Sequence, residues 1–285
     1  TGFTIFENIK HVDQSLILWR STSQWIGGLY FLFSILLLID IFDDNLKKSL
    51  TNYLSLNSSE IFKQSIKIIL IYTSLTLVIF IILKFINLRT FDAFNFSLTI
   101  ISSGGFLPTN NINMLFQTDI SKFILSILML VSYFSLFLTY NLVFIKRKNL
   151  HYLSEDFYLL IYLLIITSII FVFFNSERNF LNTLVSISSS VSNLGISFND
   201  ISSNLSFVYL ILVIIGGSFF STSSGLRLVK ILNLIKFSIN NLLSHTKPNQ
   251  IYLNKFSSIG RNIFKTDINK YFLTIIIFII SLFSI

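Results

Sequence analysis

Long and short apolar segments alternate along this chain, and that alternation most restricts what it can fold into. Residues 61–86 and 120–145 are each long enough to cross a bilayer as a helix, which takes about 20 apolar residues. Between them, residues 94–109 read FNFSLTIISSGGFLPT, a shorter run that stops at two serines and two glycines. Irregular backbone at membrane depth survives only where it is buried or lines a water-filled cavity. The pattern predicts a half-helix that enters the membrane and turns back. A short loop outside the membrane is the alternative.

The composition predicts an all-α integral membrane protein. Hydrophobic residues make up 53% of the chain and charged residues only 12%, against about 25% charged in soluble domains. The apolar runs are continuous rather than alternating, which favours helices over a barrel. The net charge of +8 comes from basic residues in short loops. Such loops are typical of the cytoplasmic side of a membrane protein, so we expect a lipid bilayer and no nucleic acid as partner.

The arrangement of the basic loops favours the re-entrant interpretation. The basic residues at 47–48, 146–148 and 227–247 fall on one side only if each short segment dips in and returns. The positive-inside rule then places the glycine turns outside and the basic loops in the cytoplasm. The expected spans are 15–42, 61–86, 120–145 and 157–174, with a second short segment at 180–191, an interrupted run at 204–237 and a last run from 271.

An internal repeat of span, half-helix, Ser/Asn-Gly turn and span divides the chain. Its glycine turns recur at Gly2, Gly105 and Gly195. Repeats of this length in a membrane chain point to a transport pathway where the repeats meet. We expect one transmembrane transport domain, truncated at both ends. Its parts are the end of repeat 1 (1–50), repeat 2 (51–150), repeat 3 (151–245) and the start of repeat 4 (246–285).

The turn residues suit the chemistry of a dehydrated alkali ion. Backbone carbonyls of a filter loop can replace the hydration shell of such an ion. Glycine lets the carbonyls turn inward, and the C-terminal end of a half-helix adds partial negative charge. Ser103 and Asn193 can contribute oxygens or brace the turns.

Several stretches resemble the TrkH/KtrB/HKT superfamily of bacterial and plant potassium transporters. The first is Thr1-Gly2-Phe3, followed by LILWRSTSQWIGGL at 16–29. The second is Ser103-Gly104-Gly105-Phe106, and the third is Asn193-Leu194-Gly195. The fourth is IGGSFFSTSSGLRLVK at 215–230, which is similar to the intramembrane gating loop of that superfamily.

The resemblance implies repeated membrane–pore-loop–membrane units around a central ion pathway. It also implies a homodimer, a cytosolic nucleotide-binding regulatory subunit of the TrkA/KtrA type, and a multi-pass position in the bacterial inner membrane. The implied filter, which would hold potassium, consists of Thr1, Gly2, Ser103, Gly104, Gly105, Asn193, Leu194 and Gly195. The implied gate consists of Gly216, Gly217, Ser218, Ser221, Thr222, Gly225, Arg227 and Lys230. Phe220, Ser223 and Ser224 replace glycines of the superfamily, which leaves the mobility of this loop open.

We therefore expect potassium uptake through a carbonyl-lined filter, with potassium as substrate, no cofactor and no enzymatic activity. One alternative is a sodium-selective or sodium/proton-coupled transporter of the same fold, and another is a non-conducting membrane scaffold. Bland alternatives also exist for single residues. Arg20 and Gln24 can hold the filter or simply pack the bundle. The Gly216-Gly217 pair can serve helix packing, and Arg227 and Lys230 can be positive-inside anchors.

Overall fold

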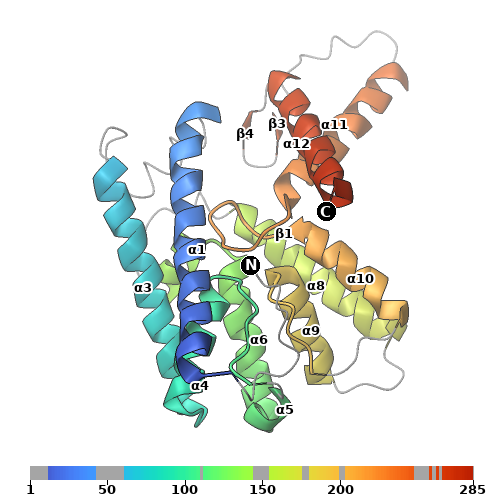
Figure 1. Cartoon of the computed structure of the whole chain (residues 1–285). Coiled ribbons are helices and arrows are strands. Elements are labelled where there is room, and N and C mark those ends of the chain that lie inside the picture. Colours follow the sequence, from blue (N-terminus) through green and yellow to red (C-terminus); the bar gives the residue numbers. More distant parts are fainter. Residues whose placement is uncertain are drawn as a thin grey trace.

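Helices build most of the fold (Figure 1). The computed structural model describes residues 12–42, 61–109, 112–143, 154–174, 180–198, 203–246, 257–258, 261–262 and 265–284. The helices are α1 (Gln14–Phe42), α3 (Ile61–Phe85), α4 (Thr90–Ile101), α5 (Ile112–Leu115), α6 (Asp119–Tyr133), α7 (Leu136–Val143), α8 (Ser154–Phe174), α9 (Phe180–Ser192), α10 (Ser203–Ile214), α11 (Leu228–Thr246) and α12 (Lys265–Ser284). Parallel β1 (Ile215–Gly216) and β2 (Leu226–Arg227) form one short pair, and antiparallel β3 (Ser257–Ser258) and β4 (Arg261–Asn262) form another. The all-helical prediction is confirmed apart from these strands.

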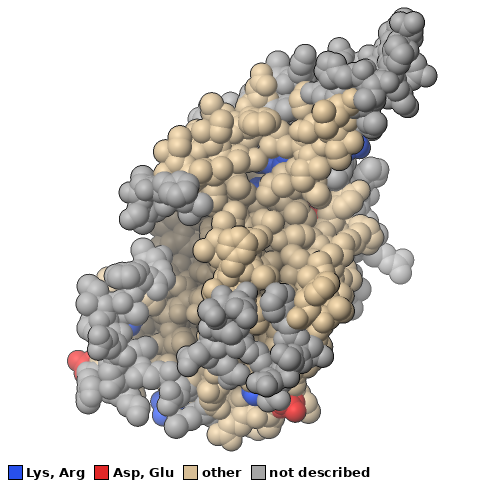
Figure 2. Space-filling model, turned by 90° about the vertical axis from the view of Figure 1, so that its right-hand side faces the viewer, with Lys and Arg blue, Asp and Glu red and all other residues tan. Residues whose placement is uncertain are grey.

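Two helices of the described chain are long and apolar enough to cross a membrane, at Phe62–Phe85 in α3 and Glu155–Phe173 in α8. Their outer faces carry large exposed apolar side chains, including Leu70, Leu77 and Val172. The face in Figure 2 is mostly uncharged, and charged side chains gather at its lower end. A large apolar surface of this kind fits contact with lipid.

Two buried apolar clusters hold the helices together. The first joins α1, α3, α4, α6 and α7, and the second joins α8, α9 and α10 with Tyr133 of α6. In Figure 1, α1 and α3 run side by side, while α11 and α12 extend away from the other helices. The two clusters place α6 at the junction between the two groups of helices.

The short helices α4 and α9 lie inside the protein despite their polar residues. In α4, Asn95, Ser97 and Thr99 are fully buried. Each donates a hydrogen bond to a carbonyl one turn earlier in its own helix; for Asn95 Nδ2 and the Phe91 oxygen the distance is 2.8 Å. Buried polar groups need hydrogen bonds, and these back-bonds satisfy the Asn95 amide N–H and the two hydroxyls, while Asn95 Oδ1 has no partner among the described residues. Polar short helices can therefore be enclosed by apolar long ones.

The third predicted span, 120–145, is wrong as a single helix. The structure breaks it: α6 ends at Tyr133, and α7 begins at Leu136. Phe134 takes an extended conformation with φ −78° and ψ 164°. Neither proline nor glycine lies at the break. Its cause is therefore tertiary, and the partners of its backbone are described below.

Candidate functional site

The α4 half-helix ends in a left-handed turn. Ser103 has φ 53°, and the N–H of Gly104 donates to the Thr99 oxygen at 2.9 Å. The Ser103 N–H donates to the Ile100 oxygen at 3.3 Å. These two bonds make a Schellman motif, the usual way to satisfy the last carbonyls of a helix. Gly105 follows with φ 77°, a conformation that side chains strain.

The α9 half-helix ends in the same way. Asn193 has φ 60°, and the N–H of Leu194 donates to the Ser189 oxygen at 3.0 Å. The Asn193 N–H donates to the Ser190 oxygen at 3.2 Å, and Gly195 follows with φ 70°. The two turns therefore share one backbone conformation, although their side chains differ. Asn193 and Ser103 occupy the same place in each.

These two turns touch. A Cβ atom added at Gly105 would overlap the carbonyl oxygen of Leu194. By contrast, a Cβ at Gly195 would meet nothing within 4 Å. The structure thus brings two predicted filter segments together. The first predicted segment, Thr1 and Gly2, lies outside the described residues.

Helix α1 holds the α4 turn from one side. Gln24 is buried, and its Nε2 donates to the carbonyl oxygen of Gly104 at 2.6 Å. The guanidinium of Arg20 lies 3.9 Å from the centre of the Phe106 ring, within the range of a cation–π contact. The sequence left packing and bracing open for these two residues. The structure shows that both contact the turn segment directly.

Residues 217–225 form a loop whose ends are joined by the β1–β2 pair. This segment, the ring loop, lies across the last carbonyls of both half-helices. The Thr222 hydroxyl donates to the Ile101 oxygen at 2.8 Å. The Ser223 hydroxyl donates to the Val191 oxygen at 3.1 Å. Ile101 and Val191 hold the same place in α4 and α9, so neighbouring loop residues bind matching carbonyls.

The left-handed residues of both turns bind the ring loop as well. The hydroxyls of Ser103 and Thr222 lie 3.4 Å apart. The Nδ2 of Asn193 donates to the Ser224 hydroxyl at 2.7 Å and to the Ser224 carbonyl at 3.0 Å. Polar contacts therefore fasten the ring loop to both turns.

Arg227, in β2 just after the ring loop, binds several oxygen atoms of the loop. Its Nη1 donates to the Gly217 oxygen at 2.9 Å, to the Ser221 hydroxyl at 3.1 Å and to the Ser218 oxygen. Lys230, which was predicted with the gate, lies on α11 with its Nζ 5.8 Å from the centre of the Tyr271 ring on α12. The structure therefore brings Arg227 to the predicted gate.

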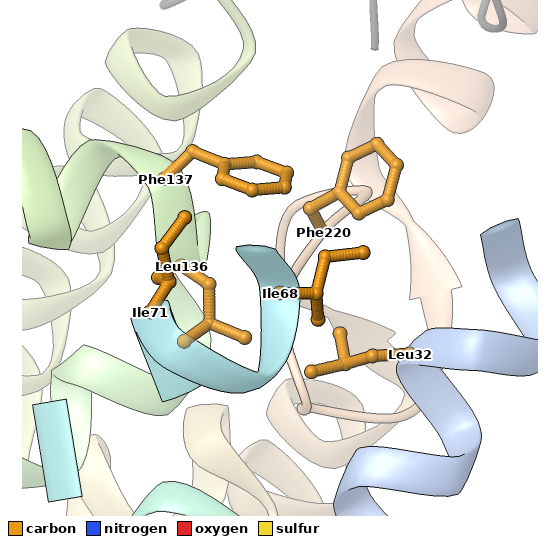
Figure 3. A pocket seen from close by; sticks show the side chains of 6 residues that line it. All are labelled: Leu32, Ile68, Ile71, Leu136, Phe137 and Phe220. Carbon is orange, nitrogen blue, oxygen red and sulfur yellow. The ribbon is translucent and has the colours of Figure 1, made fainter. Parts of the chain in front are cut away.

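An apolar pocket lies beside the ring loop (Figure 3). The Phe137 and Phe220 rings make an edge contact, with centroids 5.1 Å apart and an interplanar angle of 61°. Phe220 stands where the similar superfamily stretch has glycine, and its ring closes one wall of the pocket. An apolar lining offers no ligand to a hydrated ion. The pocket is lined by Leu32, Ile68, Ile71, Leu136, Phe137 and Phe220.

Adjacent glycines on α1 give a matched test of how tightly α4 is held. A Cβ at Gly28 would lie 2.6 Å from the Tyr72 hydroxyl and 3.1 Å from the Ser102 Cβ, whereas one at Gly27 meets nothing within 4 Å. We expect Gly28→Ala to destabilise the protein by about 1–3 kcal/mol, the usual cost of overpacking. Thermal unfolding in detergent should show a lower Tm for Gly28→Ala than for Gly27→Ala. Equal Tm values would contradict the close packing of α1 against Tyr72 of α3 and Ser102 at the end of α4.

No family model matches the chain, but individual proteins do. An uncharacterized cation transporter of Methanocaldococcus jannaschii is 26% identical over 250 residues, which cover 83% of this chain and 50% of that protein. The Trk system potassium uptake protein TrkH of Salmonella typhimurium is 23% identical over 269 residues, which cover 88% of this chain and 56% of that protein. The chain spans about half the length of these relatives.

A solved structure agrees with the sequence matches. The crystal structure of the potassium transporter TrkH from Vibrio parahaemolyticus superposes with a TM-score of 0.74 at 17% identity. The match covers 95% of this chain and 58% of that one. At this identity the likeness establishes the fold. By fold and by sequence, the chain is TrkH-like.

Proposed function

We propose that the chain forms part of a potassium uptake pathway through a membrane. This proposal rests mainly on the contact between the turns that end α4 and α9. The two turns have the same backbone conformation and meet at Gly105 and Leu194. Matching turns from two repeats that meet at one place are what a filter of several loops around an axis requires. The TrkH-like fold and the names of the similar proteins agree with this assignment.

The turns supply oxygen atoms for a cation. The carbonyls of residues 103–105 and 193–195 would hold the ion, helped by the negative ends of α4 and α9. Asn193 Oδ1 is buried and accepts no hydrogen bond from the described residues. A buried acceptor oxygen without a donor is costly, and a bound cation would satisfy it. In this proposal Gln24 fixes the Gly104 carbonyl, while the ring loop obstructs the path below the turns.

The proposal extends to the setting of the protein. The superfamily resemblance implies a homodimer in the bacterial inner membrane with a TrkA/KtrA-like cytosolic regulatory subunit. A sodium-selective or sodium/proton-coupled transporter would use the same fold. The oxygen cage alone does not discriminate between these ions, so the test must include competition between them.

Rubidium uptake provides the test. Cells that lack their own potassium systems would carry the complete gene, and ⁸⁶Rb⁺ uptake would be measured in potassium-poor medium. We expect uptake well above that of cells with empty vector, with K⁺ competing more strongly than Na⁺. Stronger competition by Na⁺ would favour the sodium transporter. Absence of uptake, with the protein present in the membrane alongside its regulatory subunit, would favour a non-conducting scaffold.

A further inference from the structure

The break between α6 and α7 is filled by backbone groups of the ring loop. The Ser218 N–H donates to the Tyr133 oxygen at 3.0 Å, and the Ser223 N–H donates to the Ser132 oxygen at 3.2 Å. On the other side of the break, the Leu136 N–H donates to the carbonyl of Phe220 at 3.0 Å. The loop therefore supplies both donors and an acceptor to the broken helix.

These are the groups that would bond to one another if the helix were unbroken. In an α-helix each N–H donates to the carbonyl four residues earlier. Leu136 would then donate to Ser132, and residue 137 would donate to Tyr133. In the structure, the ring loop binds both carbonyls and the Leu136 N–H instead. A docked ring loop and an unbroken helix exclude each other.

Asp156 of α8 completes the broken state. Its side chain is buried, and its Oδ1 accepts the Ser135 N–H at 2.9 Å. Ser218 of the ring loop lies close enough to influence the same carboxylate. Asp156 thus bonds to the exposed backbone of the break and lies beside the loop that fills it.

In a membrane, release of the ring loop favours closure of the helix. Backbone groups at membrane depth must have partners, because lipid provides none. If the ring loop left the break, the Ser132 and Tyr133 carbonyls would lose their donors. Closing the helix restores partners to both without any other part of the protein. The broken and continuous forms are therefore two self-consistent states of one segment.

We propose that the ring loop and the 132–136 break form one two-state unit. With the loop docked, the span is broken at Ser135. With the loop withdrawn, α6 and α7 join into one continuous helix. Asp156 is a positioning residue that favours the docked state. The inference deepens the proposed function by tying the opening of the pathway to straightening of this span, and it rests on that proposed function only for its link to ion flow.

Two substitutions should trap opposite states. Ser135→Pro keeps the conformation of Phe134, whose φ of −78° and ψ of 164° are those that proline imposes on the residue before it. It removes the Ser135 N–H that Asp156 accepts in the broken form, but it disfavours a continuous helix by about 3 kcal/mol or more. Gly217→Ala should expel the loop, because its Cβ would overlap the Tyr133 oxygen and lie 2.7 Å from the Ser221 hydroxyl. It leaves helix closure unaffected.

The chain contains no cysteine, so spin labels can be placed at will. Labels on Ile127→Cys in α6 and Leu142→Cys in α7 would sit on side chains that are 49% and 69% exposed. An unbroken helix would separate the two Cα atoms by ~22 Å at 1.5 Å per residue. The broken form, with the extended Phe134 between α6 and α7, would give a different separation. Pulsed electron–electron resonance of the complete protein in lipid nanodiscs would measure the distance distribution.

We expect Ser135→Pro to show only the distance of the broken form, Ser135→Ala to keep the wild-type distribution, and Gly217→Ala to shift it to the ~22 Å of the unbroken helix. Asp156→Leu should move in the same direction as Gly217→Ala. Asp156→Asn should stay near wild type, because its amide oxygen still accepts the Ser135 N–H.

The broken-form distance in folded Gly217→Ala protein, or the ~22 Å distance of the unbroken helix in Ser135→Pro protein, would overturn the proposal. A shift in Asp156→Asn equal to that in Asp156→Leu would remove the role given to Asp156. The distances do not depend on transport. Expected distances without rubidium uptake would therefore overturn the proposed function and leave the two-state unit supported.

Discussion

Gly105→Ala is expected to lower ⁸⁶Rb⁺ uptake roughly a hundredfold, equivalent to ~3 kcal/mol. Two effects add at this position. The φ of 77° strains any side chain, and the new Cβ would overlap the Leu194 carbonyl oxygen. The turn must therefore move away from its neighbour, and the ion-binding carbonyls would move with it. Uptake should be measured with membrane expression of the variant confirmed by immunoblot.

Gly195→Ala is the matched control, because it introduces the backbone strain of a positive φ without the steric overlap that a side chain at Gly105 makes with Leu194. Gly195 has φ 70°, so it carries similar conformational strain, but a Cβ there meets nothing within 4 Å. We expect a decrease of only about fivefold, corresponding to ~1 kcal/mol of strain. Equal losses in the two variants would show that the contact between the turns at Gly105 has no part in uptake.

Arg227→Gln is expected to raise ⁸⁶Rb⁺ uptake roughly tenfold. Arg227 binds the Gly217 and Ser218 carbonyls and the Ser221 hydroxyl, and these bonds hold the ring loop in its docked shape. Hydrogen bonds to charged groups contribute about 1.5–3 kcal/mol, and a tenfold change needs ~1.4 kcal/mol. Removing the charge should shift the equilibrium away from the docked loop. The measurement is the initial uptake rate at matched expression.

Arg227→Lys refines this prediction. Lysine keeps the charge, but it cannot reproduce the planar group of donors with which arginine binds several oxygens at once. We expect an uptake rate between those of wild type and Arg227→Gln. A decrease in uptake for both variants, with intact expression and Tm, would mean that Arg227 supports the open pathway rather than the docked loop.

Much of the fold could be predicted because its signal is local. A continuous apolar run identifies α3 and α8, and a run that stops at Ser and Gly identifies the end of α4. The same signal located the turn at Asn193. The helices follow the predicted segments to within a few residues wherever hydropathy alone decides the boundary.

The break at Ser135 could not be predicted, because its cause is distant in sequence. The residues around it, Val131-Ser132-Tyr133-Phe134-Ser135, are compatible with an uninterrupted apolar helix. The partners that stabilise the break come from Asp156 and from the ring loop, far along the chain. No local pattern reports such contacts. Two acidic residues in the first turn of α8, Glu155 and Asp156, were the available hint.

In the candidate site, too, local features could be predicted and contacts between distant segments could not. The glycines of the turns and loop were found from their sequence pattern, because their conformations require glycine or a close approach. Gln24 was noticed, but its bond to Gly104 depends on how α1 packs against α4. The position of Lys230 beside Tyr271 could not be predicted either, because spacing along the chain does not show how α11 packs against α12.

The β1–β2 pair limits the conformational entropy that the ring loop can gain when it is released. Its register joins Ile215 to Leu226 and Gly216 to Arg227, so both ends of the loop are held at one place. The entropy of closing this segment has thus already been lost before the loop docks. The docked and released loops then differ little in conformational entropy. The free-energy difference between them depends on a small number of hydrogen bonds. Such a balance can be tipped by forces of a few kcal/mol, which is the scale of an ion or a regulatory subunit binding nearby.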